Sequence, residues 1–279
     1  MNFDIYKLAE KKIITVAHRG LFAGNIPCNT IPAFNAALTE GADMIELDVD
    51  MSRDGKLVIF HPGMERAFLG TDKKIPELDF DEVRKLRYIN YDNTPTEYPV
   101  ATFDEVMEAF RGRCFINVDK FWMHPKEIYD AIKRHGVEDQ VIIKSAWESG
   151  VGDILSDLGC DLAYMPIVKG SHPSHNELMK SGINYIGAEV LFDSEDSEVA
   201  SPEFIDMMHR DGKLIWANAI IYNYKAQLTA RHSDDAAILG DPDFGWGWLA
   251  RRGFDIIQTD WVGMMSRYLD SKGLLYKAK

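Results

Sequence analysis

The feature that most constrains the fold is a regular alternation between short β-rich runs and longer amphipathic segments. Each run ends in polar residues, and the apolar residues of the segments recur with the period of a helix. The β-rich runs occupy residues 13–17, 44–49, 114–119, 140–146, 162–168, 184–191, 213–219 and 255–261. The clearest helical segments occupy residues 30–41, 102–112 and 124–136. Eight strand–helix units without a break in composition predict a (β/α)8 TIM barrel, and a doubly wound open sheet is the alternative.

The length of the chain and two long stretches define the expected domain organisation. A chain of 279 residues suits a single α/β barrel, and we expect one domain over residues 1–279. Residues 62–100 follow the strand-like "KLVIFH" and are too long for an ordinary loop, so we expect a small inserted cap after the second core strand. Residues 221–247 are expected to form an aromatic, glycine-rich loop near the active-site end.

The run "MIELDVDM" carries an unusual set of acidic residues. Strand alternation places its apolar side chains on one face and the carboxylates of Glu46, Asp48 and Asp50 on the other. Buried, unpaired carboxylates are costly, and a hard divalent cation, Mg²⁺ or Ca²⁺, is their natural partner. Asp119, at the end of the run 114–119, adds a third ligand to Glu46 and Asp48. The alternatives are a solvated edge strand, a buried arginine partner, or an Asp119 that caps the next turn.

Two histidines lie at strand ends near these acids. The stretch "TVAHRGLF" delivers His18, Arg19 and Gly20 in succession, and His61 closes "KLVIFH". Imidazoles have a pKa near neutrality and suit general acid–base work, although a single histidine at a strand end is more often structural. The Arg19 guanidinium is suited to hold phosphate oxygens, and Gly20 allows the backbone to approach a ligand closely. The pattern favours phosphoester chemistry.

These stretches resemble the glycerophosphodiester phosphodiesterase family. The resemblance is carried in order by "AHRG", "GADMIELDV", "DGKLVIFH", "INVD", "IIKSAW", "WAN" and "FDIIQTD", and it covers nearly the whole chain. It implies a TIM barrel with an insertion after strand two. It also implies metal-dependent hydrolysis of glycerophosphodiesters to glycerol 3-phosphate and an alcohol. Family members are thought to act through attack of the glycerol 2-hydroxyl on phosphorus, which gives a cyclic phosphate that water opens.

The resemblance assigns roles to five residues of this chain. Glu46, Asp48 and Asp119 are expected to bind one divalent cation, either Mg²⁺ or Ca²⁺. His18 and His61 are expected to form the acid–base pair, and the sequence does not say which of them donates the proton.

Three positions depart from the family pattern. The chain has Cys28 where the family usually has a glutamate, Pro62 where it usually has an aspartate after the histidine, and Asp119-Lys120 in place of Glu-x-Lys. Because Lys120 directly follows Asp119, strand alternation is expected to turn its side chain away from the site. The acidity lost at position 28 is expected to be supplied from across the barrel by Glu189.

The remaining substrate-binding candidates follow from these departures. Arg19 is expected to bind the phosphate together with either Lys120 or Lys144. If Lys144 points into the barrel, it replaces the lysine of the family's Glu-x-Lys; if it points outward, it is a snorkelling surface lysine. Trp216, the first residue of "WAN", is expected to wall the pocket.

Composition limits the partners. A net charge of −13 and a pI of about 5.1 argue against nucleic acid and against stable association with an anionic membrane. The three cysteines form no CxxC motif, and the first residues resemble no signal peptide, so a cytoplasmic enzyme of glycerol and lipid metabolism is expected. The oligomeric state and the alcohol head group stay open. The alternative functions are a lysophospholipase D or sphingomyelinase-D-like lipid phosphodiesterase and a non-catalytic phosphoester-binding barrel.

Overall fold

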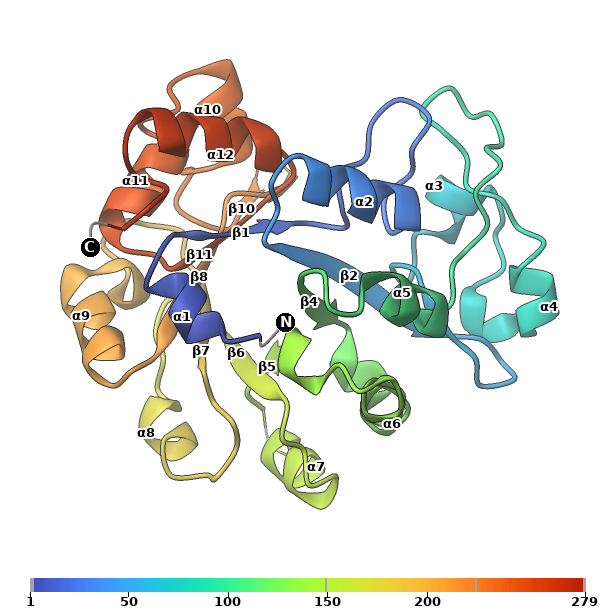
Figure 1. Cartoon of the computed structure of the whole chain (residues 1–279), viewed down its shortest axis with the longest axis horizontal. Coiled ribbons are helices and arrows are strands. Elements are labelled where there is room, and N and C mark those ends of the chain that lie inside the picture. The colour runs from blue at the N-terminus through green and yellow to red at the C-terminus, as the bar shows by residue number, and fades with distance from the viewer. Residues whose placement is uncertain (1–2, 149, 224, 278–279) are drawn as a thin grey trace.

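The architecture is a closed parallel barrel, described by a computed structural model for residues 3–148, 150–223 and 225–277 (Figure 1). The barrel strands are β1 (Ile14–Ala17), β2 (Met44–Met51), β4 (Phe115–Asp119), β5 (Val141–Ala146), β6 (Ala163–Lys169), β7 (Gly187–Leu191), β8 (Leu214–Asn218) and β11 (Ile256–Thr259). The hydrogen-bonded order is β1-β11-β8-β7-β6-β5-β4-β2, and parallel pairing of β1 with β2 closes the ring. The predicted (β/α)8 barrel is therefore confirmed, and the open sheet is excluded.

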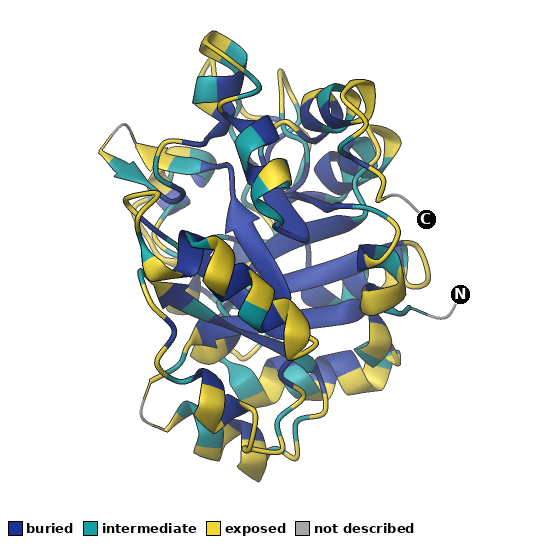
Figure 2. Ribbon diagram, turned by 90° about the vertical axis from the view of Figure 1, so that its left-hand side faces the viewer, coloured by how far each residue is buried: buried dark blue, intermediate teal, exposed yellow. Residues whose placement is uncertain are grey.

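Helices surround the strands, and α1 (Ile5–Ala9) covers the amino-terminal end of the barrel; buried faces point toward the barrel and exposed faces outward (Figure 2). The other helices around the barrel are α2 (Ile31–Thr39), α5 (Phe103–Phe110), α6 (Pro125–His135), α7 (Val151–Asp157), α8 (His175–Leu178), α9 (Pro202–Arg210), α10 (Asp234–Leu239), α11 (Trp246–Arg252) and α12 (Val262–Ser271). Short 3₁₀ turns are η2 (Phe121–Met123), η3 (Glu138–Gln140) and η4 (Glu198–Ala200). Side-chain caps define several starts: Thr30, Thr102 and Ser201 each accept a backbone N–H of the first turn. None of the described helices is long and apolar enough to cross a membrane.

Residues 62–100 form a substructure beside the barrel. Strand β3 (Leu57–Ile59) pairs antiparallel with β2, and α3 (Glu65–Leu69), η1 (Ile75–Glu77) and α4 (Phe80–Val83) follow. A hydrophobic cluster of their own holds these elements together; it includes Val58, Phe60, Leu69, Ile75, Val83 and Tyr88. We propose that this is the expected insertion within a single domain.

The stretch 221–247 is more ordered than a loop. It contains the antiparallel pair of β9 (Ile221–Asn223) and β10 (Ala226–Gln227), then α10 and the first two residues of α11. Trp246 is 2% exposed, and its indole N–H donates to Asp234 at 2.7 Å, so it belongs to the packed core. The expectation of one aromatic loop was wrong because Ser233 caps a helix there.

The barrel interior changes character along its axis. Near the amino ends of the strands the inward side chains are apolar and pack against α1; they include Ile14, Met44, Phe115, Ile142, Trp216 and Ile256. Further along these strands, and on β7, the inward positions are polar; they include Glu46, Asp48, Asn117, Asp119, Lys144, Glu189, Asn218 and Gln258. Strand alternation thus puts the polar group at the carboxyl-terminal mouth of the barrel, where TIM-barrel active sites lie.

Candidate active site

A cavity of about 220 Å³ occupies the carboxyl-terminal mouth of the barrel. Among its lining residues are eight that the sequence singled out: His18, Arg19, Glu46, His61, Asp119, Lys120, Lys144 and Glu189. They lie on β2, β4, β5 and β7 or directly after β1, β3 and β4. The fold therefore gathers candidates from position 18 to position 189 into one small volume.

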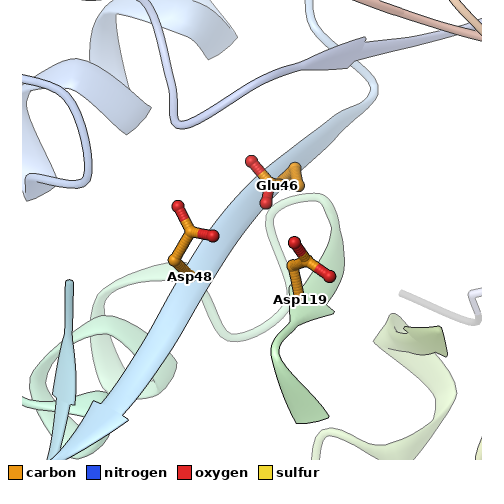
Figure 3. A group of neighbouring side chains, drawn as sticks. All are labelled: Glu46, Asp48 and Asp119. Carbon is orange, nitrogen blue, oxygen red and sulfur yellow. The ribbon is translucent and has the colours of Figure 1, made fainter. Parts of the chain in front are cut away.

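Three carboxylates converge at one side of this cavity (Figure 3). Glu46 and Asp48 extend from β2, and Asp119 extends from the neighbouring strand β4. Asp119 is paired in register with Asp48. One ligand oxygen from each lies within 4.8 Å of the others. Asp48 is fully buried, and Oδ1 of both Asp48 and Asp119 lacks a hydrogen-bond partner. Converging oxygen ligands with unsatisfied atoms fit a hard divalent cation.

Electrostatics at this cluster also favour a cation. Burial, reinforced by the charge of Asp48, raises the pKa of Glu46 to about 7. Burial acts in the same direction on Asp119, but Lys120 and Lys144 outweigh it and lower its pKa. The Arg19 backbone N–H donates to Glu46 Oε2 at 2.8 Å, and the Arg19 guanidinium Nε lies 2.9 Å from Asp48 Oδ2. The acids are therefore only partly neutralised by the chain itself.

The two histidines differ in their partners. His18 Nδ1 donates to the carboxylate of Asp260 at 2.8 Å. Burial lowers the pKa of His18, but Asp260 and the charge of Glu46 outweigh it, so the pKa is raised. His61 Nδ1 donates to the Pro62 carbonyl at 2.9 Å, and burial lowers its pKa. A carboxylate and a carbonyl only accept, so Nδ1 carries the proton in both rings and Nε2 is the atom that can exchange one. Nε2 of His61 lies 3.9 Å from Asp48 Oδ1.

Lys120 does not follow the sequence prediction. Its φ of 61° places the backbone in the left-handed region, which breaks the strand alternation directly after Asp119. The side chain therefore turns back: Nζ lies 2.6 Å from Asp119 Oδ2 and 3.6 Å from Asp48 Oδ1. The expectation that Lys120 points away from the site was wrong.

Lys144 points into the barrel. Its side chain is 4% exposed, and Nζ lies 2.5 Å from Glu189 Oε2 and 4.0 Å from the centre of the Trp216 ring. Asn218 Nδ2 donates to Glu189 Oε1 at 2.6 Å and thereby fixes that carboxylate. Trp216 has no exposed surface and does not line the cavity, so the expectation that it walls the pocket was wrong; its ring contacts the ammonium of Lys144 instead.

Two residues of the site were not singled out from the sequence. Asp260 is the hydrogen-bond partner of His18. Because Gln258 points inward, strand alternation would have predicted an inward side chain at position 260 as well. Asn29 donates from Nδ2 to Asp48 Oδ2 at 2.9 Å, and its φ of 56° lets the chain turn under Arg19. The sequence pattern does not predict this contact between the Asn29 amide and the Asp48 carboxylate.

Fold and site together define a (β/α)8-barrel protein whose strand ends carry a cluster of three carboxylates, able to hold a cation, with two histidines nearby. A model of the glycerophosphoryl diester phosphodiesterase family matches residues 18–217. The chain belongs to this family.

Relatives and solved structures agree with that assignment. The chain is 32% identical over 142 residues to a glycerophosphodiester phosphodiesterase of Caldanaerobacter subterraneus subsp. tengcongensis, covering 48% of this chain and 58% of that protein. A Bacillus altitudinis glycerophosphodiester phosphodiesterase is 30% identical over 139 residues, or 46% of this chain and 56% of that protein. The matched region thus spans a little over half the length of each of these curated relatives.

Structural similarity extends over nearly the whole fold. A glycerophosphoryl diester phosphodiesterase from Parabacteroides distasonis superposes with a TM-score of 0.77 at 20% identity, covering 97% of this chain and 93% of that chain. A phosphodiesterase from Oleispira antarctica, solved with the product sn-glycerol-3-phosphate, has a TM-score of 0.70 at 18% identity over 95% of this chain and 99% of that chain. These likenesses establish the shared barrel.

Proposed function

We propose that the protein hydrolyses glycerophosphodiesters to glycerol 3-phosphate and an alcohol, and that Glu46, Asp48 and Asp119 bind the divalent cation this reaction uses. The observation that carries the proposal is that Glu46, Asp119, His18 and His61 line one cavity in a member of this family, and that a carboxylate oxygen of Asp48 lies within 4.8 Å of one from each of the two acids. When bound, Mg²⁺ or Ca²⁺ would supply positive charge that stabilises a phosphoryl oxygen in the transition state.

Positive side chains would hold the phosphate. Arg19, Lys120 and Lys144 all line the cavity, and each is mostly buried. Their charges would bind the diester and oppose the negative charge that develops on its oxygens during attack. Lys144 would have to share its ammonium between Glu189 and the phosphate, and Trp216 beneath it limits where that ammonium can move.

The hydrogen bonds of the histidines support distinct roles. We assign proton donation to His18, because its Nδ1 bond to the Asp260 carboxylate stabilises the charged ring. We assign proton acceptance to His61, because its Nδ1 bonds only a neutral carbonyl. His61 Nε2 would take the proton of the glycerol 2-hydroxyl as that oxygen bonds to phosphorus.

The bond from phosphorus to the alcohol oxygen then breaks, and His18 protonates the departing alkoxide. In the second half, His18 takes a proton from water as the water oxygen bonds to phosphorus. The bond from phosphorus to the glycerol O2 breaks, and His61 returns the proton to that oxygen. The products are glycerol 3-phosphate and the free alcohol, and both rings regain their starting protonation.

A panel of glycerophosphodiesters tests the proposal. Glycerophosphocholine and glycerophosphoethanolamine should be hydrolysed with Mg²⁺ or Ca²⁺, and EDTA should abolish turnover. His18→Ala and His61→Ala should each lower kcat by about 10²–10⁴-fold, the usual contribution of a positioned acid or base. Activity confined to lipid vesicles or micelles would point to a lipid phosphodiesterase instead. Metal-dependent stabilisation without turnover would point to a binding barrel.

The state of the cysteines supports the proposed location. Cys28, Cys114 and Cys160 are all free thiols. Unpaired cysteines are typical of reducing compartments, so we propose that the protein works in the cytoplasm.

A further inference from the structure

A second cavity, of about 190 Å³, lies between the loop of residues 21–29 and the inserted segment 62–100. Its walls are mainly apolar and include Phe22, Ile26, Pro27, Cys28, Phe68 and Ile89. None of the described residues that line it is an Asp, Glu, Lys, Arg or His. Burial raises the pKa of the Cys28 thiol to about 12, so this side chain is neutral and acts as a small apolar group.

The cavity lies beside the catalytic mouth of the barrel. One wall is the loop that directly follows His18, Arg19 and Gly20, and the other is the insertion that directly follows His61. The walls are tied together where Asn90 Nδ2 donates to Asn25 Oδ1 at 3.1 Å.

The base of the first wall joins the carboxylate cluster. Asn29, next to Cys28, donates from its side chain to Asp48 at 2.9 Å and from its backbone to the Arg19 carbonyl at 2.9 Å. Because Asp48 belongs to the carboxylate cluster and Arg19 lines the catalytic cavity, these two bonds fix the first wall of the second cavity against the catalytic site.

The two cavities have opposite chemistry. The catalytic cavity presents carboxylates, amides and ammonium groups that suit a phosphate and the hydroxyls of glycerol. The second cavity presents aromatic and aliphatic groups, and its volume exceeds the roughly 150 Å³ of an apolar protein cavity that binds benzene. A charged group placed there would lose its hydration without gaining a counter-charge.

We propose that this second cavity binds the apolar part of the alcohol released from the substrate, so that the enzyme prefers glycerophosphodiesters of small uncharged alkyl or aryl alcohols. The inference rests on the proposed function, because it places the leaving group of that reaction. A phosphodiester carries its two organic groups on different oxygens. With the glycerol in the polar cavity, the other group would extend across the loop of residues 21–29 toward the apolar one.

A homologous series of substrates tests the assignment. Glycerophosphodiesters of methanol, propanol and pentanol are compared by kcat/KM with the metal that supports turnover. In the wild type, kcat/KM should rise about twofold to fourfold for each methylene that leaves water. Ala67→Leu, on α3, places a larger side chain in the cavity and so reduces its free volume. This variant should lower the pentyl-to-methyl ratio of kcat/KM at least fivefold.

Two further variants control the experiment. Ala23→Leu alters an exposed alanine of the same loop that does not line the cavity, and it should keep the wild-type ratio. Phe68→Ala enlarges the cavity and should move the preference toward longer alcohols, which gives a second measurement if the leucine variant folds poorly.

The outcomes separate the two proposals. Equal kcat/KM values across the wild-type series, or a wild-type ratio in Ala67→Leu and Phe68→Ala, would overturn the pocket assignment while the phosphodiesterase proposal stands. Turnover only with long-chain substrates in micelles would also overturn it. Absence of hydrolysis for every member, including the methyl diester, would overturn the proposed function and this inference with it.

Discussion

The buried pair of Lys144 and Glu189 allows a quantitative test of what holds the floor of the cavity. Nζ lies 2.5 Å from Oε2, and the two side chains are 4% and 9% exposed. Lys144→Met keeps the length of the side chain but leaves Glu189 buried without its cation. Breaking a buried pair in this way costs about 3–5 kcal/mol. We expect the lower end, about 3 kcal/mol, because Asn218 still donates to the carboxylate.

The reverse and double variants make the argument specific. Glu189→Gln should cost less, about 1–2 kcal/mol, because the ring of Trp216 still faces the ammonium at 4.0 Å. The double variant Lys144→Met/Glu189→Gln removes both charges and should lie within about 1 kcal/mol of the wild type, as replacement of a buried pair by neutral groups often does. The coupling between the sites would then exceed 2 kcal/mol.

Urea unfolding in metal-free buffer measures these free energies, and kcat/KM is measured in parallel. The double variant should recover stability but not activity, because the proposed phosphate contact of Lys144 is lost in it. A loss below 1 kcal/mol in Lys144→Met, or additive losses in the double variant, would refute the reasoning about the pair. Recovery of kcat/KM in the double variant would remove Lys144 from substrate binding.

Three further outcomes are expected. Lys120→Met should tighten Mg²⁺ binding about tenfold by titration calorimetry, because the ammonium 2.6 Å from Asp119 no longer opposes the cation; an unchanged Kd would contradict this. Gly20→Ala should lower the unfolding free energy by at least about 2 kcal/mol, since φ is +81° and a Cβ would lie 2.7 Å from the Ala33 carbonyl carbon. The bond to Asp255 raises the pKa of His209, so its stabilisation is complete below the unfolded-state pKa and fades as pH rises through the folded-state pKa. Because this ring is 39% exposed, His209→Ala should cost only about 0.5 kcal/mol more at pH 5.5 than at pH 8.5, and an equal cost would argue against the assignment.

The fold and the acidic cluster were predictable because both depend on local periodicity. Alternation along β2 put Glu46 and Asp48 on the inward face, and the parallel neighbour β4 carried Asp119 to the same level. These features need only the strand period and the order of neighbouring strands. The direction of Lys144 stayed open between an inward side chain and a snorkelling one, and the structure shows the inward one.

The errors arose where a single backbone angle or a distant contact decides. Lys120 turns back into the site because one residue adopts a positive φ at a strand end, which a two-residue period cannot anticipate. The contact of Asn29 with Asp48 joins segments whose relation depends on the folded loop. The ordered helix within 221–247 was hidden by its glycines and aromatic residues, although Ser233 gave a capping signal.

The bond between His18 and Asp260 joins the first and last strands of the barrel across 242 positions of sequence. A chain emerging from the ribosome therefore displays His18 early but cannot orient its ring until β11 has been synthesised and inserted beside β1. Arrested nascent chains that lack β11 would carry both imidazoles and the acidic cluster, yet leave one ring free to rotate. Catalytic competence would then appear late in biosynthesis and would indicate that the barrel has closed.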